Sequence, residues 1–192
     1  MATAALSTDK REAILDAALA LFGERTFDGT AMPVLADRAG VGTGTIYRYF
    51  PSKDALVNAL YQRWKLAFAD VMAPPFPDLL TTREQFGVLW ARLVYFARAN
   101  PVAFTFLETH HHAGYLDDDS VAIGDEIDRP LLSWIRVGQH AGAIRPGSPE
   151  VLLALAYGAF VGLFKTLRRL DRPLTPAAAA RSEDAVWALL RA

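Results

Sequence analysis

The sequence lacks cysteine and has no uninterrupted apolar run of about 18 residues. Without cysteine, disulfide bonds and thiolate metal sites are excluded, which fits a protein of the reducing cytoplasm. Without a long apolar run, we expect no membrane span. The stretch from Met1 to Leu6 has neither a basic start nor a long apolar core, so we expect no cleaved signal peptide.

Charge of one sign is not in excess either. The chain has 20 basic and 21 acidic side chains and a net charge of −1, which taken alone argues against a nucleic-acid partner. The distribution is uneven, however. Residues 43–65 contain four basic residues and one acidic residue, a local charge of +3. These are Arg48, Lys53, Arg63 and Lys65 against Asp54.

Alternation with a period of two, the mark of strands, is also missing, and no internal repeat occurs. Apolar residues instead recur at helical spacing between proline, glycine and polar breaks. The pattern predicts helices over about 9–22, 32–39, 43–50, 52–72, 82–99, 102–113, 120–142, 149–170 and 176–191. Residues 1–8 are expected to fray, and Pro130 is expected to kink its helix or restart it.

The stretch from Gly40 to Lys53 places a sharp turn, a short helix and a new helix start within fourteen residues. Gly40 can take the positive φ of a tight helix-helix turn. Ile46 and Phe50 are four residues apart and share a buried face, whereas the other side chains are small or polar. Such a helix is typical of the second helix of a helix-turn-helix, which enters the major groove of DNA.

The residues themselves resemble the DNA-binding signature of the TetR/AcrR family of bacterial regulators, over about 50 residues that include the first helix. The matching elements are Thr30, Leu35-Ala36, Ala39-Gly40-Val41, Gly44-Thr45-Ile46-Tyr47, Tyr49-Phe50, Lys53 and Leu56. The remaining two thirds of the chain resembles the family only in length and helical pattern.

The resemblance implies an all-α, TetR-like fold. Residues 1–55 would form a three-helix DNA-binding head, and residues 56–192 a six-helix ligand-binding and dimerisation body. It also implies a cytoplasmic homodimer that binds a pseudo-palindromic operator in double-stranded DNA and a small-molecule effector, with no cofactor and no membrane partner. The residues expected at the DNA are Thr30, Gly42, Thr43, Gly44, Thr45, Tyr47, Arg48, Tyr49 and Lys53.

Two residues depart from the family pattern. Pro33 stands near a position that is often basic and touches the DNA backbone, so that contact is expected to be missing. Gly42 replaces the usual serine cap of the reading helix, which moves the base contacts toward Thr43 and Thr45. Arg48 is the side chain best suited to read guanine. By resemblance, Tyr47, Tyr49 and Lys53 clamp the DNA backbone, although Tyr47 could instead pack its ring within the domain.

For residues 56–192 we expect a ligand pocket and a dimer interface. In a protein of this family the helices after residue 80 enclose a largely apolar pocket, so an apolar or aromatic effector is expected. The expected lining is Trp90, Leu93, Phe104, Leu107, His111, Tyr115 and Trp134. The last two helices are apolar enough to form a four-helix dimer interface or, alternatively, an internal core. The interface residues would be Leu155, Gly158, Gly162, Val186 and Leu190.

Other functions find less support. Consecutive residues of His110-His111-His112 point about 100° apart on a helix and cannot all ligate one metal. Glu108 and His112 share a face, but a polar pocket lining or exposed histidines at a helix end are better readings than a metal site. No phosphate-binding loop or nucleophile motif occurs, so neither a metal nor a catalytic site is expected. The alternative to a regulator is a helical ligand-binding or scaffold protein whose head no longer reads DNA.

Overall fold

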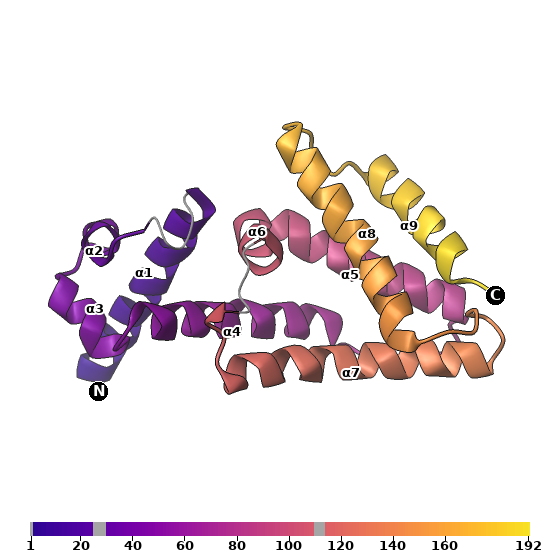
Figure 1. The fold of residues 1–192 in the computed structure, drawn as a ribbon, viewed down its shortest axis with the longest axis horizontal. Helices are drawn as coiled ribbons and strands as arrows, with labels where there is room; N and C mark the ends of the chain where they lie inside the picture. Colours follow the sequence, from indigo (N-terminus) through magenta and orange to yellow (C-terminus); the bar gives the residue numbers. More distant parts are fainter. Residues whose placement is uncertain (1, 25–29, 110–113) are drawn as a thin grey trace. The chain divides into compact units, whose positions relative to one another are not determined.

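The computed structural model describes residues 2–24, 30–109 and 114–192. Within these ranges its regular secondary structure is helical, apart from one isolated bridge between Ile144 and Arg191, and turns and loops connect the helices (Figure 1). The helices are α1 (Ala2–Glu24), α2 (Met32–Ala39), α3 (Thr43–Tyr49), α4 (Lys53–Met72), α5 (Thr82–Ala99), α6 (Pro101–Thr109), α7 (Asp118–His140), α8 (Pro149–Arg169) and α9 (Pro176–Leu190). The all-α prediction and its order of helices are confirmed over the described residues.

One local prediction was wrong, and one half of another is excluded. Helix α1 begins at Ala2 and not after residue 8, because the alanine-rich start has a high intrinsic helix propensity. Of the two expectations for Pro130, a kink or a restart, the restart does not occur, because α7 runs unbroken from Asp118 to His140. Pro130 is exposed, so the carbonyl that loses its intrahelical partner can bond to water.

The chain divides into two compact units. Unit 1 contains residues 1–67 and 100–123, and unit 2 contains residues 68–99 and 124–192. The division falls inside α4 and α7, so unit 1 combines α1 to α3 with most of α4, α6 and the start of α7. Grouping by contacts therefore differs from the expected division at residue 55, which placed α6 in the body.

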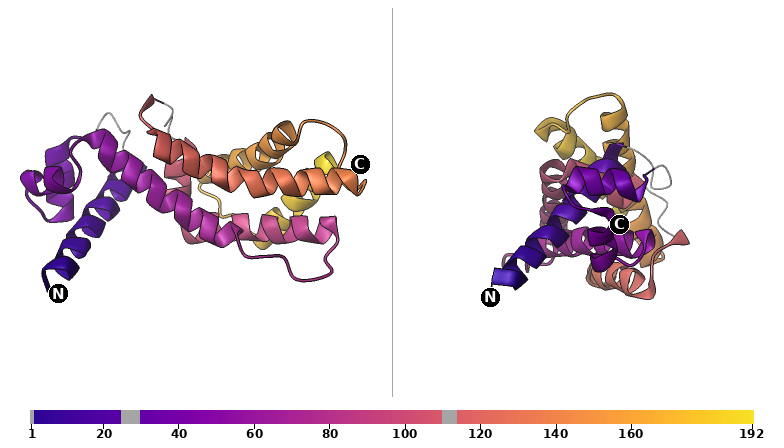
Figure 2. Two further views of the ribbon diagram at one scale, coloured as in Figure 1. Left: turned by 90° about the horizontal axis from the view of Figure 1, so that it is seen from below. Right: turned by 90° about the vertical axis from the view of Figure 1, so that its left-hand side faces the viewer.

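Unit 1 is built on α1, whose apolar face packs against α2 and α6. Ile14, Ala18 and Phe22 lie on this face and are almost fully buried. Phe22 also stacks on Phe106 of α6, with 6.1 Å between ring centroids. Figure 2 shows α2 and α3 as two short consecutive helices that lead into α4. The short reading helix is therefore supported by the core of a larger unit.

A buried polar cluster attaches α4 to the segment before α7. Asn58 is 5% exposed and donates to the Tyr115 carbonyl at 2.7 Å. Its Oδ1 accepts from the Asp117 N–H at 2.9 Å and from the Ser120 hydroxyl at 2.8 Å. Asp117 in turn accepts from the Ser120 N–H at the start of α7. Hydrogen bonding from the Ser120 side chain, and then from its N–H, lowers the pKa of Asp117. Both the nitrogen and the oxygen of the buried Asn58 amide are hydrogen-bonded, so the cluster fixes α4 against the segment before α7.

Unit 2 combines α5, most of α7, and the pair α8 and α9, which lie side by side in Figure 1. Arg83 of α5 pairs with two acidic residues of α9, Glu183 at 2.6 Å and Asp184 at 2.8 Å. The side-chain hydrogen bond to Glu183 raises the pKa of Arg83 above its ordinary value. This pair of contacts anchors α9 to α5.

Gly138 of α7 lies where a larger residue would collide with its neighbours. A Cβ there would lie 2.6 Å from Cδ1 of Ile144 and 3.1 Å from Cγ2 of Thr82. Ile144 is 1% exposed and cannot move aside freely. We therefore expect Gly138→Ala to reduce the free energy of unfolding by about 1–3 kcal/mol, measured by thermal or urea unfolding.

Gly44→Ala is the matched control, because a Cβ at Gly44 would meet no atom within 4 Å. On an exposed helix, that change should stabilise the protein by about 0.5–1 kcal/mol. Equal stability of the two variants would mean that α7 does not pack as closely on Ile144 as described.

Candidate nucleic-acid interface and ligand cavity

The turn between α2 and α3 depends on Gly40, which has φ 66° and ψ 32°, in the left-handed region. This conformation lets the N–H groups of Gly40 and Val41 bond back to the end of α2, Val41 to the Ala36 carbonyl at 3.0 Å. An L-residue with a side chain rarely adopts it, which explains the glycine at this point. The expected positive φ at Gly40 is confirmed.

Helix α3 begins at Gly42, the cap residue, which is extended at φ −73° and ψ 148°. Its carbonyl accepts from the Thr45 N–H at 2.8 Å. Ile46 and Phe50 are 0% and 3% exposed and hold the helix against the rest of unit 1. The prediction that these two residues share the buried face is confirmed.

The opposite face of α3 is open. Gly44, Tyr47 and Arg48 are exposed, whereas Thr43, Thr45 and Tyr49 are half-buried. Tyr47 is 49% exposed, so about half of its surface stays open to solvent on this face. The Arg48 guanidinium lies over the Tyr49 ring, with its carbon 5.2 Å from the ring centroid. Helix α3 thus presents small groups, hydroxyls and a cation outward on a rigid support.

The next helix starts directly after this face. The Ser52 hydroxyl accepts from the Ala55 N–H at 3.0 Å and caps α4, as predicted. Lys53 is the first residue of α4 and half-buried. Backbone N–H groups at the start of a helix and a nearby cation both favour a phosphate group.

Thr30 does not lie on this surface. Ala31, not Thr30, is the cap residue of α2, and no side-chain hydrogen bond caps that helix. Thr30 is 2% exposed, because its side chain turns into the interior of unit 1. The prediction of Thr30 as the cap was wrong, and a DNA contact through its hydroxyl is incompatible with this burial.

The basic surplus of residues 43–65 is smaller at the surface than in the sequence. Arg63 pairs with Asp16 at 2.7 Å and with Glu12 at 3.3 Å, both on α1. Lys65 pairs with Glu108 of α6 at 3.8 Å. Arg63 and Lys65 thus interact with acidic residues of α1 and α6. The other two cations are Arg48, on α3 itself, and Lys53, the first residue of α4.

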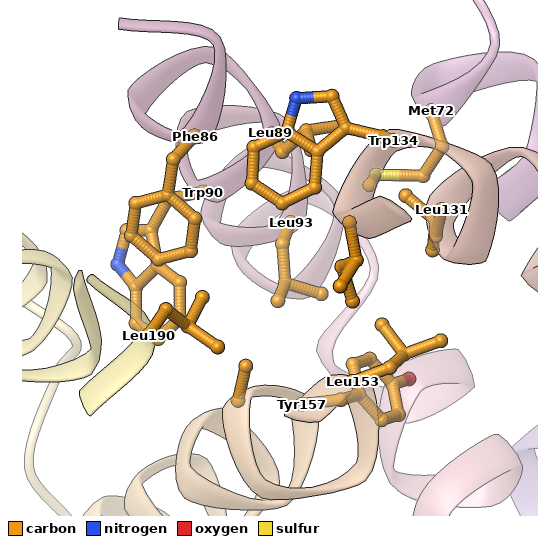
Figure 3. Close-up of a pocket in the computed structure, with 12 residues that line it drawn as sticks. Met72, Phe86, Leu89, Trp90, Leu93, Leu131, Trp134, Leu153, Tyr157 and Leu190 are labelled. Carbon is orange, nitrogen blue, oxygen red and sulfur yellow. The ribbon is translucent and has the colours of Figure 1, made fainter. Parts of the chain in front are cut away.

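Unit 2 contains a partly open cavity of about 60 Å³ between the end of α4 and helices α5, α7, α8 and α9 (Figure 3). Its lining is almost wholly apolar: Met72, Phe86, Leu89, Trp90, Leu93, Leu131, Trp134, Ile135, Leu153, Ala156, Tyr157 and Leu190. Both tryptophans satisfy their N–H groups outside it. Trp90 Nε1 donates to the Ala179 carbonyl at 3.1 Å, and Trp134 Nε1 donates to Gln85 Oε1 at 2.9 Å. The cavity therefore favours an uncharged molecule with few hydrogen-bonding groups.

Of the residues predicted for a pocket, Trp90, Leu93 and Trp134 line this cavity. Phe104 and Leu107 lie instead in the core of unit 1, 0% and 6% exposed. Tyr115 belongs to the segment bound by Asn58, and His111 and the other two histidines of that run lie outside the described residues. Sequence reasoning missed the contributions of α8 and α9, because an apolar stripe shows that a face is buried but not what covers it.

The predicted interface residues fall into two groups. Leu155, Gly158 and Gly162 lie exposed along one face of α8, and a Cβ on either glycine would meet no atom within 4 Å. Val186 and Leu190 are 6% and 1% exposed, and Leu190 lines the cavity. These two residues are packed inside their own chain, so they offer little surface to a second copy.

Helix α8 is also the one helix in the described part of the chain that is long and apolar enough to cross a membrane, by length and composition only. Only 22% of its most apolar window is buried.

In the described ranges, no group of three or more histidine, aspartate or glutamate side chains could hold a metal ion.

Two descriptions of one protein family match the chain along most of its length. "Bacterial regulatory proteins, tetR family" matches residues 14–60. "Tetracyclin repressor-like, C-terminal domain" matches residues 61–192, more than half of the chain. The chain belongs to the TetR family.

Individual TetR-family proteins agree with this. The transcriptional regulator RutR of Escherichia coli is 30% identical over 160 residues, which cover 77% of this chain and 70% of RutR. The transcriptional repressor KstR of Mycobacterium tuberculosis is 47% identical over 53 residues, 27% of this chain and 24% of KstR. A tetR family transcription regulator from a Shewanella species has a TM-score of 0.81 at 25% identity, covering 95% of this chain and 98% of its own.

The protein is thus a TetR-family transcriptional regulator with an N-terminal DNA-binding domain and a C-terminal domain, and not an enzyme. Helices α2 and α3 are its helix-turn-helix. The two residues that depart from the family pattern lie within this motif. Pro33 is the second residue of α2, and Gly42 is the cap residue of α3.

Proposed function

We propose that this regulator is a homodimeric repressor. It binds a pseudo-palindromic operator in the cytoplasm and leaves the DNA when a small apolar molecule occupies the cavity of unit 2. The observation that carries the proposal is the open polar face of α3 on a buried support, because an unpartnered face of this kind suits the major groove. The relative KstR is named as a transcriptional repressor, which supports repression over activation.

Within the reading head, Arg48 and the threonines Thr43 and Thr45 would contact base edges, and Tyr47, Tyr49 and Lys53 would hold phosphates. Arginine can bond to guanine through two nitrogens, a contact worth about 1–3 kcal/mol of discrimination against other bases. Gly42 and Gly44 carry no side chain, so the backbone at the start of α3 could approach the DNA closely. Neither glycine has an internal reason to be small, since a Cβ at each would meet nothing closer than 4.0 Å.

The exposed face of α8 would form the dimer interface. Two exposed glycines inside one helix each cost about 0.8–1.0 kcal/mol relative to alanine. Gly158 and Gly162 occupy one face four residues apart, beside Leu155, which is 50% exposed. Small residues in this spacing let another helix approach closely, so a second α8 would cover the stripe. A two-fold dimer also presents two reading heads to half-sites about 34–36 Å apart.

The effector would be small, neutral and apolar, because the cavity has neither a charged residue nor an available indole N–H in its lining. Pockets for drug-sized ligands measure about 300–1,000 Å³, well above the cavity of about 60 Å³ seen here. A ligand would therefore select an expanded arrangement of α5, α7 and α8. Because a ligand shifts only an equilibrium between states that it binds unequally, this need for expansion supplies the required preference.

The test starts from a preformed protein–operator complex and a panel of small molecules, half of them neutral and aromatic or alicyclic and half charged. Neutral molecules should release the DNA. Leu153→Trp, which fills the cavity, should keep operator affinity and lose the release. Val137→Trp on the exposed side of α7 should behave like the unchanged protein, because Val137 is 65% exposed and does not line the cavity. Release by charged molecules alone, or release that survives Leu153→Trp, would contradict the proposed effector site.

A further inference from the structure

A second hollow lies in unit 2, between one face of α5 and one face of α9. It is open to solvent and measures about 600 Å³, within the range of about 300–1,000 Å³ that small-molecule sites occupy. We call it the α5–α9 groove. Its lining residues recur at spacings of three and four on both helices, among them Ala91, Val94 and Arg98 on α5 and Pro176, Ala179 and Glu183 on α9. The groove has the size of a ligand site, and its lining indicates which ligand it suits.

The middle of the groove is apolar. Trp90 and Val94 of α5 are 4% and 9% exposed and form its base. The Trp90 N–H has no bond to offer a ligand, because Nε1 already donates to the Ala179 carbonyl at 3.1 Å. The facing wall on α9 carries the small apolar side chains of Ala179 and Ala180. A hydrocarbon or aromatic body gains free energy by leaving water for this surface, whereas a polar one finds no partner there.

Glu183 closes one end of the groove, and its charge is compensated. The Arg83 guanidinium binds Glu183 Oε1 at 2.6 Å. The same oxygen packs against α5 at Gly87, where a Cβ would lie only 3.1 Å from it. Glycine at this position leaves room for the carboxylate. The acidic residue of the groove therefore already has a cation and is held in place.

The two helices run antiparallel along the groove. Gly87 of α5 lies beside Glu183 of α9, and three residues later Trp90 bonds to Ala179, which precedes Glu183. Arg98, in the last turn of α5, therefore lies toward the start of α9. At a rise of 1.5 Å per residue, Arg98 is about 16 Å from Gly87 along the helix axis. An apolar stretch of about this length separates Arg98 from the closed end.

Arg98 supplies a cation without a counter-charge. Its side chain is exposed and forms no ion pair with any residue that the structure describes. The connection from α8 into α9 is basic as well, since residues 168–172 contain three basic residues and one acidic residue. Positive charge at one end of an apolar groove attracts an anion. Arginine can donate two parallel N–H groups to the oxygens of a carboxylate or a similar acid group.

We propose that the α5–α9 groove binds an organic monoanion with an apolar body, such as an aromatic or aliphatic carboxylate. Arg98 binds the acid group, and the body lies against Trp90 and Val94. A second acid group at the other end of the ligand would meet the Glu183 carboxylate, so a single charge at one end fits best. The proposal does not depend on the effector role proposed for the apolar cavity, which suits uncharged molecules.

The probe is 1-anilinonaphthalene-8-sulfonate, an anion whose fluorescence rises in apolar surroundings. N-phenyl-1-naphthylamine has the same rings without the sulfonate and is the neutral comparison. Arg98→Gln should raise the Kd of the anionic probe about threefold to tenfold, because a partly exposed charge-assisted contact is lost. It should leave the Kd of the neutral probe unchanged. Arg129→Gln, at an exposed position of α7, is the matched control and should change neither value.

Three further variants place the probe. Ala180→Trp fills the groove from α9 and should weaken binding of the anionic probe by about tenfold or more. Ala185→Trp, at an exposed position of the same helix outside the groove, should leave that binding unchanged. Leu153→Trp fills the apolar cavity instead and should also leave it unchanged. Cooperative thermal unfolding of each variant confirms that the values belong to folded protein.

Several outcomes would overturn the proposal. Equal weakening of both probes by Arg98→Gln would show that Arg98 does not bind the acid group. Anionic binding that survives Ala180→Trp, or that is lost only in Leu153→Trp, would place the probe outside the groove. If sedimentation showed that Ala180→Trp changes the oligomeric state, a second copy of the chain would occupy the groove. Failure of the unchanged protein to bind the anionic probe would also contradict the site.

Discussion

Replacing Gly158 and Gly162 together with leucine is expected to yield a folded monomer that binds the operator about 100-fold more weakly or worse. A Cβ on either glycine would meet no atom of the neighbouring helices within 4 Å, so leucine has room in the monomer and raises the helix propensity of α8. Two leucines on the proposed interface would instead hold two helices apart. A dimer binds both half-sites at once, and the loss of this second attachment accounts for the large effect on DNA affinity. Sedimentation measures the association, and titration of labelled operator measures the affinity.

The control adds two leucines at exposed positions of α7, Glu126→Leu with Arg129→Leu, and should remain dimeric. A glycine variant that stays dimeric would move the interface to another surface. If the unchanged protein instead partitioned into membranes, the exposed apolar face of α8 would have a lipid partner, and the dimer proposal would fail.

Arg48→Ala is expected to lower discrimination between operator and scrambled DNA by about 10- to 100-fold for each half-site, because a bidentate arginine–guanine contact is lost. Tyr47→Phe and Lys53→Ala should instead weaken binding to every sequence and flatten the dependence of affinity on salt, since phosphate contacts carry no base preference. Competition titrations with operator and scrambled duplexes at two salt concentrations separate the two behaviours.

Arg129→Ala removes the same charge from an exposed position of unit 2 and should leave both affinity and selectivity unchanged. Full selectivity in the Arg48→Ala protein would show that Arg48 does not read bases. Thr43 and Thr45 would then be the remaining candidates on α3.

The features predicted correctly from the sequence are those set by local spacing. Gly40 is required by the geometry of one turn, and the pair Ile46 and Phe50 follows from four-residue periodicity. Residues whose environment is set by distant parts of the chain were less predictable. Thr30 has the chemistry of a helix cap, yet its side chain is buried, and only the packing of unit 1 decides between the two.

The body illustrates the same limit. Val186 and Phe104 were recognisable as apolar residues on helical faces, but their partners are not encoded in the spacing. Val186 faces the interior of its own chain and Phe104 packs in unit 1, so neither lies where an interface or a pocket was expected. Charge counting failed for a related reason. Arg63 and Lys65 look like a basic surplus in sequence, but acidic residues of α1 and α6 pair with them.

The central claim is that α3 reads DNA, and it is tested most directly with the purified protein and genomic fragments from around its own coding region. Binding is measured at two salt concentrations. The account predicts a tight complex with one or a few fragments, with affinity that falls steeply as salt rises, because cations such as Arg48 and Lys53 displace counterions from phosphates. Absence of a selective fragment, both there and in a genome-wide pull-down at low salt, would contradict it. The protein would then be a helical ligand-binding protein whose head no longer reads DNA.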